Sequence, residues 1–162
     1  MLRVNDIAQR REEDMKLTDA LRGEHGAFYA LFDEIEDIAA TEDAMAQWLG
    51  ATTVLEAMVT SHEALEERLL FAALKPHLGD RSGPLATLHT EHEEMERFLA
   101  HMLQESDVDR AILWISEALG AARSHFKKEE QILFPLAERI LGDEVLIRMG
   151  REWAEVRRVT VD

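Results

Sequence analysis

Apolar residues recur every three or four positions through four long segments, and each of these stripes contains a histidine at a position typical of leucine. Such spacing places a stripe on one face of an α-helix. Three prolines and eight glycines in 162 residues leave the segments largely uninterrupted. The stripes are Leu21, His25, Phe28, Phe32, Ile35 and Ala39; Trp48, Leu55, His62 and Leu69; Leu85, Leu88, His92, Met95, Leu99 and Met102; and Ile115, Ala118, Ala122, His125, Glu129, Ile132 and Leu136.

Turn and capping residues separate the four segments. Thr18 or Asp19 can cap the first helix, and Thr41 can cap the second. The run Ser82-Gly83-Pro84 can start the third, and Asp107 can cap the fourth. We therefore expect an all-α, up-down-up-down four-helix bundle.

The two ends of the chain are expected to contribute less regular structure than the four long segments. Residues 1–16 are polar and weakly patterned, so we expect an N-terminal arm before a bundle spanning 17–162. Pro135 removes a helical hydrogen bond, which predicts a kink or an early helix end there. Gly142 and Asp143 then break the chain before a short C-terminal helix ending near Arg158.

The excess of acidic residues excludes some classes of binding partner. Acidic residues number 33 against 18 basic ones, a formal net charge of −15. This charge repels nucleic-acid phosphates and anionic membranes, so we expect neither as a partner. No run reaches the roughly 18 to 20 apolar residues that span a bilayer, and the N-terminus has no signal-peptide pattern. We expect a cytoplasmic protein. With no cysteine, thiolate metal sites and cysteine nucleophiles are excluded.

The second half of the predicted bundle repeats the first. Residues 21–25 match residues 88–92 in the pattern LxxEH, and residues 61–71 match residues 124–134 in the pattern SHxxxEExxLF. Each half thus contains a helix with one inward histidine, followed by a helix with an inward HxxxE. The repeat retains polar residues at core positions, which packing alone does not require.

The repeated polar residues form a metal-ligand pattern. Glu66 and Glu129 lie one turn after a histidine on the same helix face. Buried carboxylates and imidazoles need partners, and a divalent cation satisfies all of them at once. Antiparallel helices would bring the four histidines to roughly one level, where the two carboxylates can bridge two metals. Imidazole with carboxylate suits iron, manganese or zinc better than calcium.

Ferritin-like di-iron sites use a different spacing, Glu-x-x-His. None of the residues three positions before the four histidines is glutamate, which argues against that class. Those residues are Arg22, Val59, His89 and Ala122.

The pattern resembles the hemerythrin family, in its HHE cation-binding branch, whose motif is H–HxxxE–H–HxxxE. It appears here as His25, then His62 with Glu66, then His92, then His125 with Glu129, and the resemblance covers residues 18 to about 158. It implies a non-haem di-iron centre in a four-helix bundle. Glu66 and Glu129 would bridge the irons, His25 and His62 would bind one, and His92 and His125 the other. Manganese or zinc could replace iron.

The third helix departs from the oxygen-carrying members of that family, which have a further histidine one turn after the third-helix one. Here Glu96 takes that position, and His89, one turn before His92, is our candidate for the missing ligand. Tyr29 could reach the site, although core packing is the simpler expectation. Three further residues are expected outside the site: Glu63 on the surface, His77 in a turn and His101 on the opposite helix face.

The resemblance implies that the iron centre binds dioxygen or a related small molecule such as nitric oxide or peroxide. One alternative is an iron-dependent peroxidase, a catalase-like enzyme or a nitric-oxide-detoxifying enzyme. Another is an iron or oxygen sensor or an iron-storage protein. The simplest alternative is a helical interaction module with a vestigial site. The oligomeric state stays open.

Overall fold

The computed structural model describes residues 15–39, 45–79 and 82–159, and all regular structure in these ranges is helical. The all-helical prediction is confirmed. The elements, in chain order, are α2 (Leu17–Ala39), α3 (Met45–Glu66), η1 (Glu67–Phe71), α4 (Ala72–Leu78), α5 (Pro84–Gln104), α6 (Val108–Lys128), η2 (Glu129–Leu133), α7 (Phe134–Leu141) and α8 (Asp143–Arg157), where η1 and η2 are π-helical.

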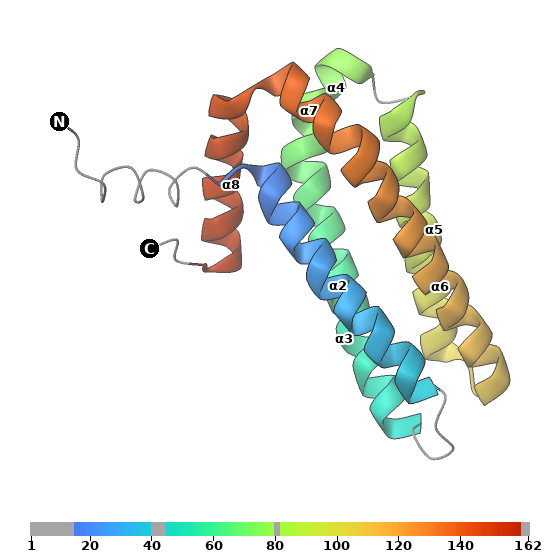
Figure 1. Cartoon of the computed structure of the whole chain (residues 1–162). Coiled ribbons are helices and arrows are strands. Elements are labelled where there is room, and N and C mark those ends of the chain that lie inside the picture. Colours follow the sequence, from blue (N-terminus) through green and yellow to red (C-terminus); the bar gives the residue numbers. More distant parts are fainter. Residues whose placement is uncertain (1–14, 40–44, 80–81, 160–162) are drawn as a thin grey trace.

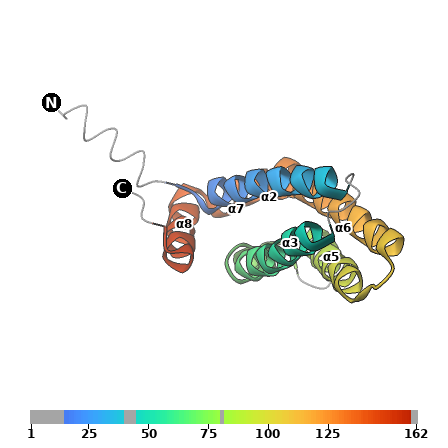
Figure 2. The same ribbon diagram turned by 90° about the horizontal axis from the view of Figure 1, so that it is seen from below.

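The four long helices pack in a ring: α2 on α3, α3 on α5, α5 on α6, and α6 back on α2. Figure 1 shows α2 beside α3 and α5 beside α6, with α4 and α7 together at one end. Seen from below in Figure 2, α8 stands at the edge of the assembly, where it packs on α2. Gly150 permits this approach because a Cβ there would collide with the carbonyl oxygen of Met15.

The helix starts follow the predicted signals in two of the places that can be compared. Pro84 occupies the first turn of α5, and the side chain of Asp107 accepts a hydrogen bond of 3.1 Å from the amide of Arg110. The prediction for the first helix was wrong by a few residues. Helix α2 begins at Leu17, and Asp19 instead accepts from the amide of Lys16 at 3.3 Å, a reciprocal contact typical of a capping box.

Two apolar clusters form the core, and the four stripe histidines lie between them. One cluster contains Phe28, Val59 and Met95, and the other contains Leu21 and Leu88. Along the chain, residues of one cluster come before each histidine, and residues of the other cluster come after it. The core is therefore divided by one polar layer.

Both segments that follow an HxxxE motif wind as π-helices, which shifts the inward face by one residue. Beyond Glu129, the buried positions are Leu133, Phe134 and Ala137. The predicted inward residue Ile132 is 60% exposed, so that prediction was wrong. A π turn contains an additional residue, so the spacing of three or four no longer applies across it. The chain stays helical through Pro135, which lies in the first turn of α7.

Some of the predicted features lie outside the residues that the structure describes. Most of the predicted arm, 1–16, and the cap Thr41 lie outside them. Gly142 separates α7 from α8, whose first residue is Asp143, and α8 ends at Arg157, close to the end predicted for the short C-terminal helix. None of the described helices combines the length and apolar character that a membrane-crossing segment needs.

Candidate metal centre

Six side chains from five helical segments converge in the polar layer, and all six are buried. They are His25 of α2, His62 and Glu66 of α3, His92 of α5, His125 of α6 and Glu129 at the start of η2. Their nitrogen and oxygen atoms form two groups, in each of which every atom lies within 4.8 Å of the others. The predicted register of the two HxxxE motifs thus brings these six residues together.

The first group contains His25, His62 and Glu129. The two Nε2 atoms of the histidines lie 3.3 Å apart. Oε2 of Glu129 is 3.3 Å from Nε2 of His25. Three atoms that are common metal ligands therefore face one another, one from each of three helical segments.

The second group contains Glu66, His92, His125 and Glu129. The Nε2 atoms of His92 and His125 lie 2.9 Å apart. Oε2 of Glu66 is 3.4 Å from Nε2 of His92. Oε1 of Glu129 is 2.9 Å from Nε2 of His125. Glu129 thus directs one oxygen at each histidine pair, which is the arrangement of a bridging carboxylate.

The two inner carboxylates are short of partners. Imidazole Nε2 atoms lie 2.9 to 3.4 Å from oxygens of Glu66 and Glu129, but these nitrogens cannot donate when the ring proton is on Nδ1. Neither carboxylate then accepts a hydrogen bond among the described residues, although both side chains are fully buried. A buried carboxylate without hydrogen bonds is costly unless a cation compensates it. Oxygen and imidazole donors that face inward without partners fit a divalent metal.

Four glutamates outside the six-residue group, here called the outer glutamates, orient the histidines; they are Glu24, Glu67, Glu91 and Glu130. In each case an Nδ1–H donates to a carboxylate oxygen, which leaves the Nε2 lone pair facing inward. Nδ1 of His62 lies 2.6 Å from Glu24, and Nδ1 of His125 lies 3.0 Å from Glu91. The other two contacts are His25 to Glu130 at 2.8 Å and His92 to Glu67 at 3.2 Å.

The four outer glutamates belong to the internal repeat. Glu24 and Glu91 each precede a metal-facing histidine, within LxxEH. Glu67 and Glu130 each follow an inner glutamate, within HxxxEE. Adjacent helical residues point about 100° apart, so one residue can face the centre while its neighbour reaches the next helix. The sequence signals for these residues were the repeated glutamate before the histidine in LxxEH and the repeated second glutamate of HxxxEE.

Different groups stabilise the outer glutamates in the two halves. Glu24 accepts hydrogen bonds from Trp153 Nε1 at 3.0 Å and Arg157 Nε at 2.6 Å, both on α8. Its counterpart Glu91 instead forms an ion pair with Lys128. The C-terminal helix therefore contacts the carboxylate that orients His62.

The pKa values of the central groups separate strongly. Burial, with the neighbouring Glu129 carboxylate, raises the pKa of Glu66 to about 8. Burial also acts on Glu129, but its contacts with His125 and His25 outweigh that effect and hold its pKa well below the usual range. Burial would lower the pKa of His92, yet Glu66 raises it to about 9. Two adjacent buried carboxylates of this kind favour a bound cation.

Glu63 is the largest correction to the sequence-based prediction. It is 5% exposed, not a surface residue, and its Oε1 has no hydrogen-bond partner among the described residues. Burial raises its pKa to about 8, and the His92 imidazole opposes that rise. In the repeat Glu63 corresponds to Phe126, whose ring stacks on His25 with centroids 4.0 Å apart.

His89 lies outside the six-residue group. Its side chain is 53% exposed, and its Nδ1 is 2.6 Å from Glu67, the same carboxylate that His92 contacts. These three residues form a third, more exposed group of metal-ligand atoms. Tyr29 also lies at the outer shell, where its hydroxyl donates to Glu130 at 3.5 Å.

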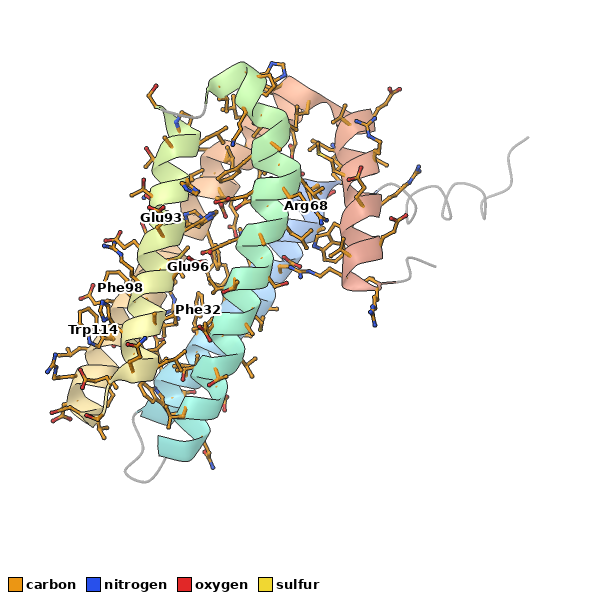
Figure 3. All side chains as sticks on the ribbon, turned by 180° about the vertical axis from the view of Figure 1, so that it is seen from behind. Phe32, Arg68, Glu93, Glu96, Phe98 and Trp114 are labelled. Carbon is orange, nitrogen blue, oxygen red and sulfur yellow. The ribbon has the colours of Figure 1, made fainter. Side chains whose placement is uncertain are left out.

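Glu96 lies between α5 and α3 (Figure 3), within hydrogen-bonding reach of Glu63, and is exposed. His77 and His101 are exposed and are in neither inner group, but His77 lies in α4 and not in the predicted turn. The ring of His101 stacks on Trp114 instead.

The comparisons with known proteins agree with this arrangement of residues. A family model described as the hemerythrin HHE cation binding domain matches residues 16–137. No curated protein and no solved structure matches the chain significantly. The match includes all six central residues and ends before α8.

Proposed function

Because the chain belongs to the hemerythrin family of HHE cation-binding domains, we propose that its central histidines and glutamates hold two metal ions, iron in the first instance. One observation carries the proposal. Four imidazole nitrogens and two carboxylates face one another in the core, and the carboxylate oxygens have no hydrogen-bond partner among the described residues. Manganese or zinc suits the same donors.

The ligands divide between the two positions by their distances. His25 and His62 would bind the first metal, and His92 and His125 the second. Glu129 is placed to bridge because its two oxygens face different histidine pairs. Glu66 would be the other bridging carboxylate, and its Oε2 faces Nε2 of His92.

Glu63 is proposed as a further carboxylate for the second position. It is buried beside His92 and Glu66, with one oxygen unpartnered. The first position has the apolar ring of Phe126 in the corresponding place. The two positions would therefore differ in charge. His89 stays a predicted metal ligand. Its support is the third, more exposed group of metal-ligand atoms, which it forms with Glu67 and His92.

A di-iron centre held by these histidines and glutamates would supply the electrons for binding dioxygen, nitric oxide or peroxide. The surrounding residues control access and position. Phe126 and Phe134 stack on the ring of His25, and Phe28 packs edge-on against His62, so apolar rings surround this histidine pair on the core side. The outer glutamates hold the proton at each Nδ1 and leave each Nε2 free to ligate. We favour reversible binding of a small molecule as the function.

The alternative functions stay open as proposals. An iron-dependent peroxidase, a catalase-like enzyme or a nitric-oxide-detoxifying enzyme is favoured by the acidic environment that Glu63 and Glu96 give the second position. A sensor or storage role would use the same ligands.

We also propose the up-down-up-down path, which the short 105–107 connection between α5 and α6 supports. A cytoplasmic location stays a prediction from the sequence.

The discriminating experiment is an optical spectrum of the anaerobic, ferrous-loaded protein before and after exposure to air. A charge-transfer band that forms with oxygen and disappears on its removal supports reversible binding. Rapid oxidation that cannot be reversed by removing oxygen favours an enzyme or sensor. Absence of any bound iron in folded protein would refute the di-iron proposal.

A further inference from the structure

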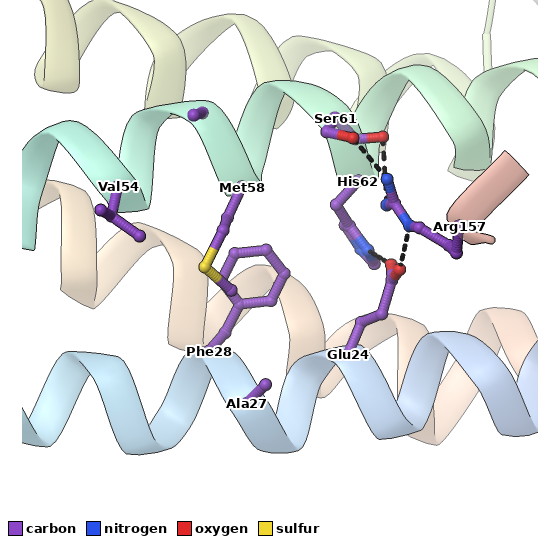
Figure 4. A pocket seen from close by; sticks show the side chains of 9 residues that line it. Glu24, Ala27, Phe28, Val54, Met58, Ser61, His62 and Arg157 are labelled. Carbon is purple, nitrogen blue, oxygen red and sulfur yellow. Dashed lines mark hydrogen bonds and ion pairs between the residues drawn. The ribbon is translucent and has the colours of Figure 1, made fainter. Parts of the chain in front are cut away.

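A cavity of about 440 Å³ lies between α2 and α3, beside the first metal position. Five of its nine lining residues are apolar, and they form one end. Figure 4 shows the side chains of Phe28 and Met58 facing each other in this space, with Val54 further along α3. Small side chains, Ala27 on α2 and Ala57 on α3, leave the room between the helices.

The other end of the cavity is polar and includes a metal-facing histidine. His62, Glu24, Ser61 and Arg157 line it. Arg157 extends from α8 to Glu24 and Ser61, as the dashed lines in Figure 4 mark. Its NH2 group also donates to the carbonyl oxygen of Ser61 at 3.3 Å.

The charges at this end are already paired. Oε2 of Glu24 contacts His62, and its Oε1 accepts from Trp153 and Arg157. The guanidinium of Arg157 is therefore engaged with Glu24 and Ser61. An anionic or cationic ligand would have to break these pairs, whereas a neutral one would not. The hydroxyl of Ser61 accepts from Arg157 and keeps its own hydrogen to donate.

We propose that this cavity binds a small neutral organic molecule that has one hydrogen-bond-accepting end and an apolar tail. The tail would lie against Phe28, Met58 and Val54, and the polar end would accept from Ser61. The volume falls within the range of about 300 to 1,000 Å³ typical of ligand pockets. This site goes beyond the metal centre, and its occupation does not require a metal.

The site is connected to the metal position through two contacts. A molecule at the polar end would press on Arg157, which holds Glu24, and Glu24 holds Nδ1 of His62. Arg157 belongs to α8, outside the part of the chain that the family model matches. The C-terminal helix thus supplies a lining residue that the matched region alone would not provide.

The probe is a series of straight-chain alcohols from 1-butanol to 1-octanol, titrated into the full-length, zinc-loaded protein. Binding is followed by saturation-transfer NMR and by the fluorescence of Trp153, whose Nε1 bonds to Glu24. We expect saturable binding that tightens roughly threefold to fourfold for each added CH₂. The titration is repeated on the metal-free protein to separate this proposal from the proposed function. A protein that binds alcohol but takes up no metal would overturn the proposed function and leave this proposal standing.

Two variants locate the site. Ala57→Trp fills the cavity and should abolish alcohol binding while metal content stays at the wild-type level. Ala100→Trp places the same ring on an exposed position of α5 and should leave alcohol binding unchanged. If Ala57→Trp does not fold by circular dichroism, Ala27→Trp fills the cavity from the opposite helix. Binding that is unsaturable, or equally strong in the filled variants, would overturn the proposal.

Discussion

Oε2 of Glu24 lies 2.6 Å from Nδ1 of His62, so the residue beside one metal-facing histidine orients the metal-facing histidine of the next helix. The same relationship holds in the second half, where Glu91 precedes His92 and contacts His125. Two further glutamates cross between the halves, from η1 to His92 and from η2 to His25. The centre is therefore held as one unit by contacts between neighbouring helices, and no helix positions its own histidine alone.

The first prediction concerns metal content. Loaded with iron under anaerobic conditions, the wild-type chain should bind two metal ions, because the donors form two groups that share Glu129. His125→Ala should lose the second metal ion. Elemental analysis of desalted protein gives the count. His101→Ala is the control, since that ring stacks on Trp114 outside both groups. One ion or none in folded wild-type protein would contradict the two-metal assignment.

The second prediction concerns stability. A ligand that binds only the folded state stabilises it by RT ln(1 + [L]/Kd), about 2.7 kcal/mol at a concentration of 100 Kd. For a chain of this size, that energy raises Tm by roughly 5 to 11 °C. Calorimetry with and without Zn²⁺ tests it. The Glu129→Gln variant, which removes the bridging charge, should show a smaller shift. Equal melting curves for the wild type with and without metal would contradict a buried site.

The third prediction concerns the outer glutamates. Substitution of a carboxylate that orients a metal-binding histidine commonly lowers metal affinity by about 10- to 100-fold. Glu91→Gln should have this effect on the second position, because the amide is a poorer acceptor for the Nδ1–H of His125. Competition with a chromophoric chelator measures the affinity. The exposed Glu34→Gln on α2 is the matched control. If both variants bind metal equally well, Glu91 has no orienting role.

The fourth prediction separates the two histidines of α5. His92→Ala should abolish binding at the second position, because His92 is buried in the central group. His89→Ala should only weaken it, since His89 reaches the centre through Glu67. Glu96→Ala should change the rate of oxidation more than metal content. The metal count and air-oxidation rate of each variant decide this. Equal metal loss in His89→Ala and His92→Ala would make His89 a direct ligand.

Periodicity was sufficient to predict the helical class and the convergence of the six central residues. The spacing of His25, His62, His92 and His125 fixes their heights in a bundle, and the HxxxE motifs fix their faces. Glu63 could not be predicted because its burial depends on packing against α5, where Glu96 and His92 lie. The outer glutamates were visible as repeated residues, but their partners are on other helices. Contacts from α8, such as that of Arg157, have no counterpart in the repeat.

The register after each HxxxE motif was mispredicted for a different reason. A spacing of three or four residues assumes α-helical winding, whereas η1 and η2 are π-helical. Each π turn inserts a residue, so Leu133 is buried where Ile132 was expected. A π turn is common next to functional sites. Here both π segments begin at or directly after a central glutamate.

The last prediction tests this shifted register by stability. Leu133 is 1% exposed and belongs to the core cluster beside the polar layer, whereas Ile132 is 60% exposed. Leu133→Ala leaves a cavity and should lower the free energy of unfolding by about 2 to 5 kcal/mol. Ile132→Ala removes an exposed side chain and should change it by less than about 0.5 kcal/mol. Urea denaturation of both variants, with metal held constant, measures the difference. A continuous α-helix through residues 129–133 would reverse the order, with the larger loss at Ile132.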